Sequence, residues 1–265
     1  MESKKVAIIT GGSSGIGKET ALSLSKRGVK VYEFSRKGES YGDVTHVNCD
    51  VTDEALVKAA VGAVSEKEGR IDILVLSAGF GISGAAEFTD EKTAKSQFDV
   101  NFFGAVNCVN AALPVMRAQK SGRIVFISSV AAVVPIPFQS FYSASKAAIN
   151  SFAQSLGNEV KPFGISVTAV MPGDIKTGFT GSRKKVIVGD EEYSGRISRS
   201  VEKMESDEQN GMNANAVGKY IAKIALKNRV KPLYSIRFDY KAVCVLAKLL
   251  PSKLMNRIIY SLYAK

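Results

Sequence analysis

A tyrosine and a lysine stand four positions apart in the stretch YSASK, residues 142–146. Residues four apart in a helix lie on one face, about one turn from each other. A nearby cation favours the phenolate and so lowers the pKa of a tyrosine from its ordinary value of about 10. A phenol with a pKa closer to neutrality exchanges protons readily with a reacting oxygen atom. Tyr142 and Lys146 therefore predict acid–base chemistry, although this spacing also occurs by chance on solvated helices.

A glycine-rich loop gives a second chemical signal. The stretch TGGSSGIG, residues 10–17, follows a short apolar run at Val6–Thr10 and opens an amphipathic segment from about Lys18 to Arg27. Glycines let the backbone turn tightly against a pyrophosphate, and a helix N-terminus offers free N–H groups and partial positive charge. The loop predicts a dinucleotide site, with a purely structural glycine turn as the alternative. The residues expected to touch the dinucleotide are Gly11, Ser13, Ser14, Gly15, Ile16 and Gly17.

The end of the second expected strand bears on the choice of dinucleotide. An acid at that point holds the ribose 2′-OH of NAD, whereas a basic residue accommodates the 2′-phosphate of NADP. The strand ends EFSRK, so Ser35 stands where the acid is expected and Arg36 follows it. A guanidinium binds phosphate through paired charge-assisted hydrogen bonds. We predict NADP(H) over NAD(H). Glu33, on the same strand face as Ser35, is the argument against, and Arg36 could instead be an ordinary exposed loop cation.

Two further strand ends carry candidate cofactor contacts. Asp50 closes the third strand in CDVTD and precedes Val51. Its carboxylate would either accept a hydrogen bond from the adenine amino group or cap the turn. The fourth strand ends in SAG, where the small residues Ala78 and Gly79 let a ribose lie against the backbone.

The elements that must position these residues alternate between strands and helices. Strands are expected at Val6–Thr10, 29–35, 45–50, 71–79, 122–129 and 164–173, and one intervening helix at 53–68 has Asp53 as its N-cap. Such alternation implies crossovers and a parallel sheet with helices on both faces. The fold class is thus α/β, a doubly wound Rossmann sheet that forms one domain over residues 1–265.

Two segments break this alternation. Residues 174–215 are polar, irregular and rich in Gly, Ser and charge, which is typical of a lid over a site. Residues 239–265 form an apolar, basic tail that is interrupted at Pro251. Beyond Pro251, one face of an expected amphipathic helix carries Leu254, Met255, Ile258, Ile259 and Leu262, while Lys253 and Arg257 lie on the other side. This helix would lie on a membrane surface, or pack on its own domain or on a sister subunit.

Composition excludes several classes of protein. The 265 residues carry a formal net charge of +11, but the basic residues are spread out and have no interleaved aromatics, so nucleic-acid binding is not expected. Cys49, Cys108 and Cys244 are far apart and odd in number, which fits a reducing compartment. With His46 as the only histidine, neither a metal site nor a histidine-based triad is expected. The N-terminus lacks the apolar core of a signal peptide and no stretch is long enough to span a membrane, so a cytoplasmic protein is expected.

Taken together, these motifs resemble the classical short-chain dehydrogenase/reductases. The resemblance runs from Val6 to about Thr180, through TGGSSGIG, CDVTD, SAG, NFFG, ISS, YSASK and PGDIKT, in the family's order and approximate spacing. One departure is LSAG, where the family commonly has Asn-Asn-Ala-Gly. The resemblance implies hydride transfer to or from a nicotinamide and assembly as a homodimer or homotetramer.

The resemblance also implies roles for individual residues. Tyr142 would be the general acid/base, and Lys146 would lower its pKa and hold the nicotinamide ribose. Ser129 would hydrogen-bond the substrate oxygen, and Asn101 would hold a water that links Lys146 to solvent. The residues implied beside the nicotinamide are Pro172, Gly173, Ile175 and Thr177.

The approach to Tyr142 suggests the kind of substrate. The stretch VVPIPFQSFYSASKAA is unusually apolar and resembles the branch of the family that handles steroids, retinoids and other lipid-like ketones. We expect a hydrophobic ketone or its secondary alcohol, hydroxysteroid-like or lipid-like. A reductase of 3-ketoacyl carriers or CoA thioesters is the nearest alternative. An NADP(H)-binding sensor without activity is the alternative of another class, and the presence of Ser129, Tyr142 and Lys146 argues against it. The apolar residues in question, some of which would belong to the core, are Val133, Val134, Ile136, Pro137, Phe138 and Phe141.

Overall fold

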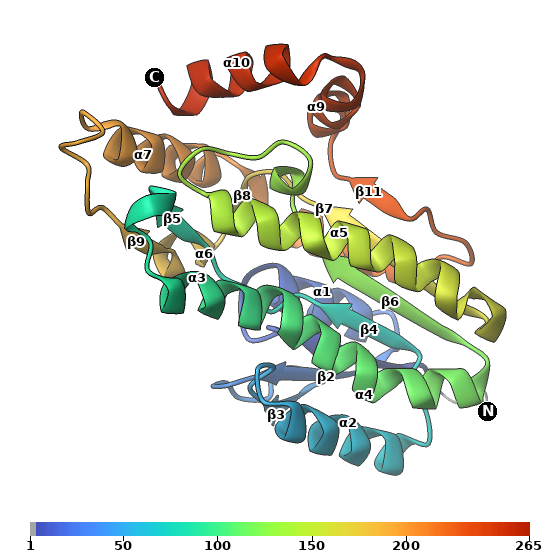
Figure 1. The fold of residues 1–265 in the computed structure, drawn as a ribbon. Coiled ribbons are helices and arrows are strands. Elements are labelled where there is room, and N and C mark those ends of the chain that lie inside the picture. The colour runs from blue at the N-terminus through green and yellow to red at the C-terminus, as the bar shows by residue number, and fades with distance from the viewer. Residues whose placement is uncertain (1–3) are drawn as a thin grey trace.

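Seven parallel strands form the central sheet of the computed structural model, which describes residues 4–265 (Figure 1). The strand order reverses beside β1, because β2 lies on one side of it and β4 on the other. The predicted doubly wound α/β fold is confirmed. In spatial order the strands are β11 (Leu233–Ser235), β7 (Ile165–Met171), β6 (Gly122–Ile127), β4 (Ile73–Leu76), β1 (Val6–Thr10), β2 (Lys30–Ser35) and β3 (Val44–Asn48).

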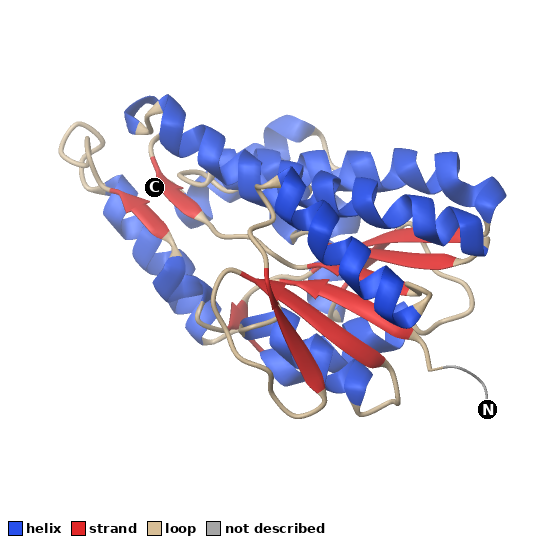
Figure 2. Cartoon of the chain, turned by 90° about the horizontal axis from the view of Figure 1, so that it is seen from below, coloured by secondary structure: helices blue, strands red, loops and turns tan. Residues whose placement is uncertain are grey.

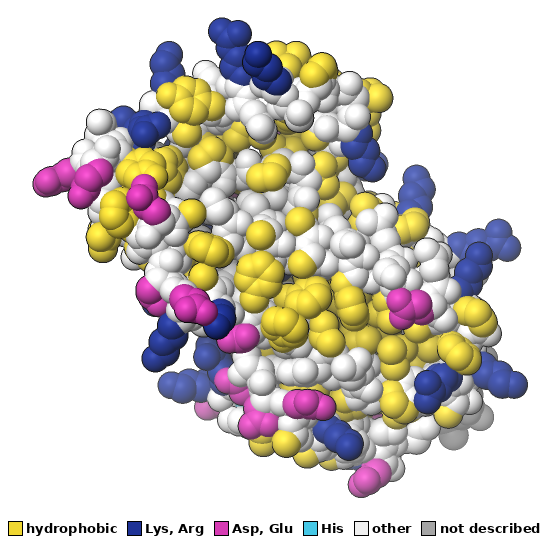
Figure 3. Space-filling model, viewed as in Figure 1, with side chains coloured by type: hydrophobic (Ala, Val, Ile, Leu, Met, Phe, Trp, Pro, Cys, Tyr) yellow, Lys and Arg dark blue, Asp and Glu magenta, His cyan; other side chains and the backbone are white. Residues whose placement is uncertain are grey.

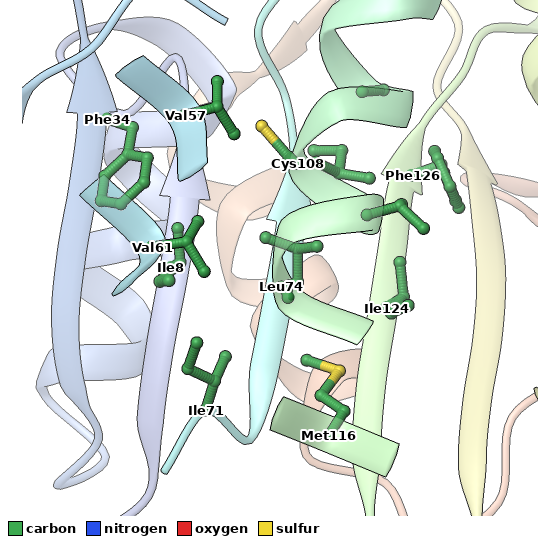
Figure 4. Packing of buried hydrophobic residues seen from close by; sticks show 14 of the residues in the cluster. Ile8, Phe34, Val57, Val61, Ile71, Leu74, Cys108, Met116, Ile124 and Phe126 are labelled. Atoms are coloured by element: carbon green, nitrogen blue, oxygen red, sulfur yellow. The ribbon is translucent and has the colours of Figure 1, made fainter. Parts of the chain in front are cut away.

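Helices cover both faces of this sheet (Figure 2). One face packs on α2 (Glu54–Glu68), α4 (Gly104–Gln119) and α5 (Ser140–Val160), and the other on α1 (Gly15–Ser25) and α8 (Ala214–Ala225). The strands are therefore apolar on both sides rather than alternating. In β1, Ile8 enters the first core and Ile9 the second. Figure 4 shows Ile8 in the first core with Leu74, Phe126 and Met116, all of which are buried.

Local signals set the ends of these elements. The Asp53 carboxylate accepts a hydrogen bond of 3.0 Å from the Leu56 N–H, which confirms the predicted N-cap of α2. The same helix ends at Gly69, whose φ of 70° suits a glycine. Helix α1 begins at Gly15, a few residues earlier than predicted, because the glycine loop itself supplies its first turn. The strands β4, β6 and β7 end earlier than predicted, so their last residues form loops at one edge of the sheet.

The segment 174–215 is more ordered than its composition suggests. It contains β8 (Ile175–Lys176), α6 (Phe179–Ser182), β9 (Lys184–Val186), α7 (Arg196–Gln209) and β10 (Met212–Asn213). The prediction of an irregular segment was therefore wrong for α7. The helix is amphipathic and buries Ile197, Val201 and Met204 in a cluster with Phe138, but its residues are so polar on average that the segment resembles a loop in composition. The small parallel pair of β8 with β10 joins the two ends of the segment, and the pair of β9 with β5 (Ile82–Gly84) ties it to the main domain.

The tail forms two helices, α9 (Phe238–Leu249) and α10 (Ser252–Tyr263), separated at Pro251 as predicted. They lie beyond α7 and the start of α5 (Figure 1), and Tyr263 and Ala264 join the cluster that holds α7. Over residues 4–265 no helix has both the length and the apolar character needed to cross a bilayer. Cys49, Cys108 and Cys244 are buried and unpaired.

Candidate active site

A cleft of about 1130 Å³ lies at the carboxyl ends of the strands. It opens where the strand order reverses, because the loops after β1 and β4 diverge to opposite faces of the sheet. The structure brings together there all of the residues predicted to contact the cofactor. These are Gly11, Ser13, Ser14, Gly15, Ile16, Gly17, Ser35, Arg36, Asp50, Val51, Ala78, Gly79, Tyr142, Lys146, Pro172, Gly173, Ile175 and Thr177.

The loop after β1 requires its glycines. Gly11 has a φ of 65°, and a Cβ on it would lie 2.9 Å from the backbone of Ala78. A Cβ on Gly17 would collide with the carbonyl oxygen of Gly11. Ser14 precedes α1 but makes no side-chain capping bond, so the N–H groups that begin this helix point toward the cleft without a capping side chain. This backbone cradle fits the pyrophosphate of a dinucleotide.

No carboxylate faces the cleft at the end of β2. The Glu33 side chain is fully buried and turned toward His46, whose Nδ1 bonds to it. The Ser35 hydroxyl donates to Glu33 Oε1 at 3.2 Å and to the Lys37 carbonyl at 3.1 Å. Arg36 is exposed, and in the described part of the chain it has no ion-pair partner. The objection that Glu33 raised against NADP(H) therefore loses its basis, and His46 gains a structural role that its sequence context did not reveal.

Asp50 caps a turn at the edge of the cleft. Its Oδ1 accepts hydrogen bonds from the backbone N–H and the hydroxyl of Thr52, at 3.0 and 2.8 Å. Of the two alternatives for Asp50, the structure shows the turn cap. Nearby, the Thr10 hydroxyl accepts the N–H groups of Ser77 and Ala78, each at 3.1 Å. Thr10 thus holds the end of β4 at the point where LSAG departs from the family pattern.

Tyr142 and Lys146 project from the first two turns of α5 beside the end of β6. Lys146 Nζ lies 5.8 Å from the centre of the Tyr142 ring and donates a hydrogen bond of 2.8 Å to the carbonyl of Ile127. Ser129 follows β6, where its Oγ accepts the Ala131 N–H at 3.1 Å. The same hydroxyl is hydrogen-bonded to the Tyr142 phenol. The three side chains named by the sequence motifs therefore meet at one point of the cleft.

Burial dominates the proton affinities at this point. It raises the pKa of Tyr142 to about 12, while the Ser129 hydrogen bond acts in the opposite direction. Burial also lowers the pKa of Lys146 to about 8. The expected lowering of the Tyr142 pKa by Lys146 is thus not seen among the protein's own groups. The reason is that both groups are desolvated and the ammonium is turned to the Ile127 carbonyl.

Asn101 lies behind the cleft rather than in its lining. It sits in a π-helical turn, Asp99–Phe103, between α3 (Glu91–Phe98) and α4. Its amide accepts the Phe80 N–H at 3.0 Å and donates to the Phe80 carbonyl and to Ser145 Oγ, each at 3.1 Å. A Cβ on Gly79 would meet Asn101 Oδ1 at 3.0 Å and Lys146 Nζ at 3.6 Å. π-Turns are often found at functional sites, but NFFG carries no sequence signal for one.

Residues 5–186 match the family model described as short chain dehydrogenase. The chain belongs to the short-chain dehydrogenase family. It is 42% identical over 243 residues to the 3-ketodihydrosphingosine reductase of Bacteroides thetaiotaomicron. The aligned region covers 88% of this chain and 90% of the relative. The chain is 34% identical over 192 residues to human retinol dehydrogenase 8, which covers 67% of this chain and 61% of the relative.

Solved structures of short-chain dehydrogenases have the same fold. A short-chain dehydrogenase from Streptomyces avermitilis superposes with a TM-score of 0.85 at 26% identity, over 98% of this chain and 97% of that one. ElxO with NADP bound gives a TM-score of 0.75 at 29% identity, over 90% and 99% of the two chains. A 3-ketoacyl-(acyl-carrier-protein) reductase from Brucella melitensis, complexed with NADH, gives 0.74 at 24% identity, over 88% and 96%. The cofactor class of the family is thus NAD(P)(H).

Beyond Tyr142, the cleft of this short-chain dehydrogenase is walled by apolar side chains. Val134 and Ile136 come from the approach to α5, as expected, whereas Phe138 turns away and packs with α7. Met204 of α7 adds to the wall, and the tail contributes most of the remainder. The tail residues that line the cleft, which the sequence did not assign to it, are Val243, Leu246, Leu250, Met255, Ile258, Ile259, Leu262 and Tyr263.

A tyrosine of the tail fastens this wall to the loop after β7. The Tyr240 hydroxyl donates to Asp174 Oδ2 at 2.8 Å and accepts the Asp174 N–H at 3.0 Å. Its ring fills the space beside Gly173, where a Cβ would collide with it. Burial raises the pKa of the Asp174 carboxyl, and the Tyr240 hydrogen bond partly offsets this. No local pattern links two residues 66 positions apart, so sequence reasoning missed this contact.

A buried ion pair closes the floor of the cleft near Phe179. Arg183, whose side chain is fully buried, bonds to Glu208 of α7, and Glu208 also accepts the Thr180 hydroxyl at 2.6 Å. The Phe179 ring centre lies 5.8 Å from that of Tyr142. The α6 region and α7 are therefore joined close to the Tyr142 ring.

Proposed function

We propose that this protein is an NADPH-dependent reductase of a long-chain, lipid-like ketone, with residues 174–215 as the lid of the site. The observation that carries the proposal is the continuity of one cleft, which joins the phosphate loop, the Ser129–Tyr142–Lys146 group and the apolar wall of the tail. Family membership makes the protein an oxidoreductase. The relatives named for a ketosphingolipid and for retinol support a lipid-like substrate.

The choice of NADPH rests on the end of β2. Ser35, Arg36 and Lys37 line the cleft there, and the one carboxylate of β2, Glu33, is buried away from it. A guanidinium and an ammonium bind a 2′-phosphate through charge-assisted hydrogen bonds, whereas a carboxylate would repel it. Gly11 and Gly17 let the loop pack closely against Ala78 and against itself, and a tight glycine turn of this kind before a helix binds a pyrophosphate. In a cell NADPH favours the direction of reduction.

Ketone reduction needs a proton donor next to the carbonyl oxygen. A bound NADPH supplies the hydride. Tyr142 supplies the proton from its Oη to the oxygen on which negative charge grows, and Ser129 steadies that oxygen with a hydrogen bond. Because burial holds the pKa of Tyr142 at about 12, the phenol is protonated at neutral pH, which is the form that reduction requires. The phenolate that remains is stabilised by its hydrogen bond with Ser129.

Lys146 and Asn101 support this donor. Lys146 is fixed by the Ile127 carbonyl in the lining of the cleft, and its proposed role is to bind the nicotinamide ribose. Asn101 approaches Lys146 across Gly79, which supports the proposal that it holds a water between Lys146 and solvent. Pro172, Gly173 and Thr177 complete the proposed nicotinamide contacts from the loop after β7.

The polar groups beside the apolar wall narrow the substrate class. Asp174 lines the cleft between Tyr142 and the tail, and among the described residues no Lys or Arg forms a direct ion pair with it, although the charge of Arg237 acts on it from farther away. A carboxylate there suits a substrate with an ammonium group close to its ketone. The compound named for the Bacteroides relative, 3-ketodihydrosphingosine, is such a long-chain 2-amino ketone. A long-chain 2-amino ketone is therefore the class that we favour over flat steroid ketones.

A ketone panel assayed with both cofactors tests the proposal. The panel comprises 3-ketodihydrosphingosine, a 3-ketosteroid, a 3-ketoacyl-CoA and a small keto sugar. We expect the highest kcat/KM for the long-chain amino ketone, and a value with NADPH at least about tenfold above that with NADH, as one charge-assisted hydrogen bond gives. Turnover confined to the sugar or the thioester would refute the substrate class. Tight NADPH binding without turnover of any ketone would indicate a sensor instead.

A further inference from the structure

The outer face of the tail is apolar and open to solvent. Phe238 is 84% exposed and Leu249 is 75% exposed, and with Val245 they lie on one side of α9 at spacings of seven and four. On α10, Leu254 and Leu262 are exposed, while Met255 and Ile259 turn inward. The single apolar face expected beyond Pro251 is therefore divided between the cleft and the surface. Figure 3 shows apolar side chains beside Lys and Arg at the end of the molecule where α10 lies.

This apolar face is bordered by cations without acidic partners. Residues 237–265 contain six Lys and Arg residues but one acid, Asp239, and that acid is bonded to Arg237. The exposed side chains of Lys241, Lys248, Lys253 and Arg257 have no ion-pair partner in the described part of the chain. A second copy seated on this face by twofold symmetry would bring like charges together. An anionic lipid surface would neutralise them instead.

The same face is continuous with the cleft. Leu246, Ile258 and Leu262 line the cleft and are still 46%, 40% and 58% exposed. They mark a place where the apolar wall beside Tyr142 reaches the surface between α9 and α10. A hydrocarbon chain that left a bilayer at this mouth would remain in contact with apolar side chains along its path to the site.

We propose that α9 and α10 lie in the surface of an anionic bilayer and admit the lipid substrate from it. Neither helix is long and apolar enough to span a membrane, and a pair with one apolar face and basic flanks binds in the interface plane. The occupant of this face is thus a lipid surface, with the dimer or tetramer expected of the family formed elsewhere. Docking is independent of the proposed function, whereas substrate entry rests on it.

Vesicle sedimentation of the full-length protein tests the docking. We expect binding to phosphatidylcholine vesicles that contain phosphatidylglycerol, weaker binding to phosphatidylcholine alone, and release by high salt. The double variant Phe238→Ser/Leu249→Ser should bind at least about tenfold more weakly, since it removes two side chains that would enter the lipid. Leu56→Ser is the matched control, because Leu56 is an exposed leucine on α2, remote from the tail, and its variant should bind like the wild type.

Three outcomes would overturn the docking. The wild type would remain in solution with anionic vesicles, or the Leu56 variant would lose as much binding as the double variant. Alternatively, in analytical ultracentrifugation without lipid, the double variant would fall to a smaller oligomer than the wild type, which would make this face a protein interface. Thermal melting of each variant shows that it is folded.

A separate readout tests substrate entry. Phe238 and Leu249 lie outside the cleft, so the double variant should reduce a water-soluble short-chain ketone like the wild type. Its activity toward a long-chain ketone embedded in anionic vesicles should fall by about the same factor as its affinity for those vesicles. Equal activity on the embedded ketone would refute entry from the bilayer. If neither protein reduces any ketone, the proposed function fails, and the vesicle binding still decides the docking.

Discussion

At the scale of single residues, the site combines two groups whose charged forms are both opposed by burial. The Lys146 ammonium has the Ile127 carbonyl as its hydrogen-bond acceptor, and its pKa is lowered to about 8. Tyr142 is held in its neutral form by the same desolvation. The fold therefore keeps the neutral Tyr142 phenol beside the Lys146 ammonium, whose burial is unfavourable. This unfavourable term lowers the free energy of unfolding and can be measured through its dependence on pH.

Replacement of the buried lysine should make stability depend on pH in a defined direction. Between pH 8 and the ordinary value of 10.5, the unfolded chain binds the Lys146 proton and the folded chain does not. The wild type should therefore gain stability relative to Lys146→Met as pH rises through this window, by up to about 1.4 kcal/mol per pH unit. Urea unfolding of both proteins at roughly pH 7.5, 8.5 and 9.5 measures the difference between their free energies of unfolding across this window. A difference that does not change with pH would contradict the account.

Sequence reasoning succeeded at this scale where one short motif carries the role. Ser129, Tyr142 and Lys146 meet in the cleft because each lies next to the carboxyl end of β6, and their spacing is local. Sequence reasoning did not find the contact between Glu33 and His46. The alternation of side chains along a strand predicts the face on which Glu33 lies, but it does not predict that His46 binds the carboxylate and keeps it out of the cleft. Sequence reasoning also misjudged the pKa of Tyr142, because burial depends on the lid and tail, which are distant in sequence.

At the scale of elements, we propose that the end of β2 sets the cofactor preference. Ser35→Asp places a carboxylate where the structure has a hydroxyl, and we expect the ratio of kcat/KM for NADPH to that for NADH to fall at least about tenfold, because the new charge repels the 2′-phosphate. Steady-state kinetics with both cofactors measure the ratio. Ser35→Ala is the control and should leave the preference for NADPH in place. An unchanged ratio in Ser35→Asp would mean that this strand end does not bind the adenine ribose.

The elements themselves were predictable where their pattern is dense. Strands such as β1 and β4 are continuous apolar runs covered on both faces, whereas β3 is a partly exposed edge strand. Asp53 caps α2 through a bond that spans three residues. The three-residue strand β11 and the charged helix α7 were missed. Strand β11 is ordered by its pairing with β7, and α7 by its packing with Phe138, and both partners lie far away in the sequence.

At the scale of the whole molecule, residues 174–215 and the C-terminal tail cover the edge of the central sheet where the strands have their carboxyl ends. Residues 174–215 and the tail meet over the cleft, where Tyr263 and Ala264 pack with Ile197 and Val201 of α7. The buried Arg183–Glu208 pair fixes the first of these segments below Tyr142. No local pattern in the sequence indicates that the amphipathic tail forms part of the wall of the cleft.

The stability of this cover depends on the buried ion pair. Glu208→Leu leaves the Arg183 charge without its partner, and we expect a loss of about 3–5 kcal/mol in the free energy of unfolding. Urea unfolding measures the loss. The double variant Arg183→Met/Glu208→Leu removes both charges and should recover most of it. If the single variant were as stable as the wild type, the pair would not hold the segment in place.

The most direct test of the central claim is the Tyr142→Phe variant, with Tyr220→Phe as a matched control outside the cleft. NADPH affinity is measured by fluorescence titration, and turnover by NADPH oxidation with the best ketone of the panel. The account predicts unchanged NADPH affinity and a kcat at least about 10²-fold lower for Tyr142→Phe, the lower range for acid–base catalysis, with Tyr220→Phe like the wild type. A Tyr142→Phe protein that keeps a nearly normal kcat would contradict it.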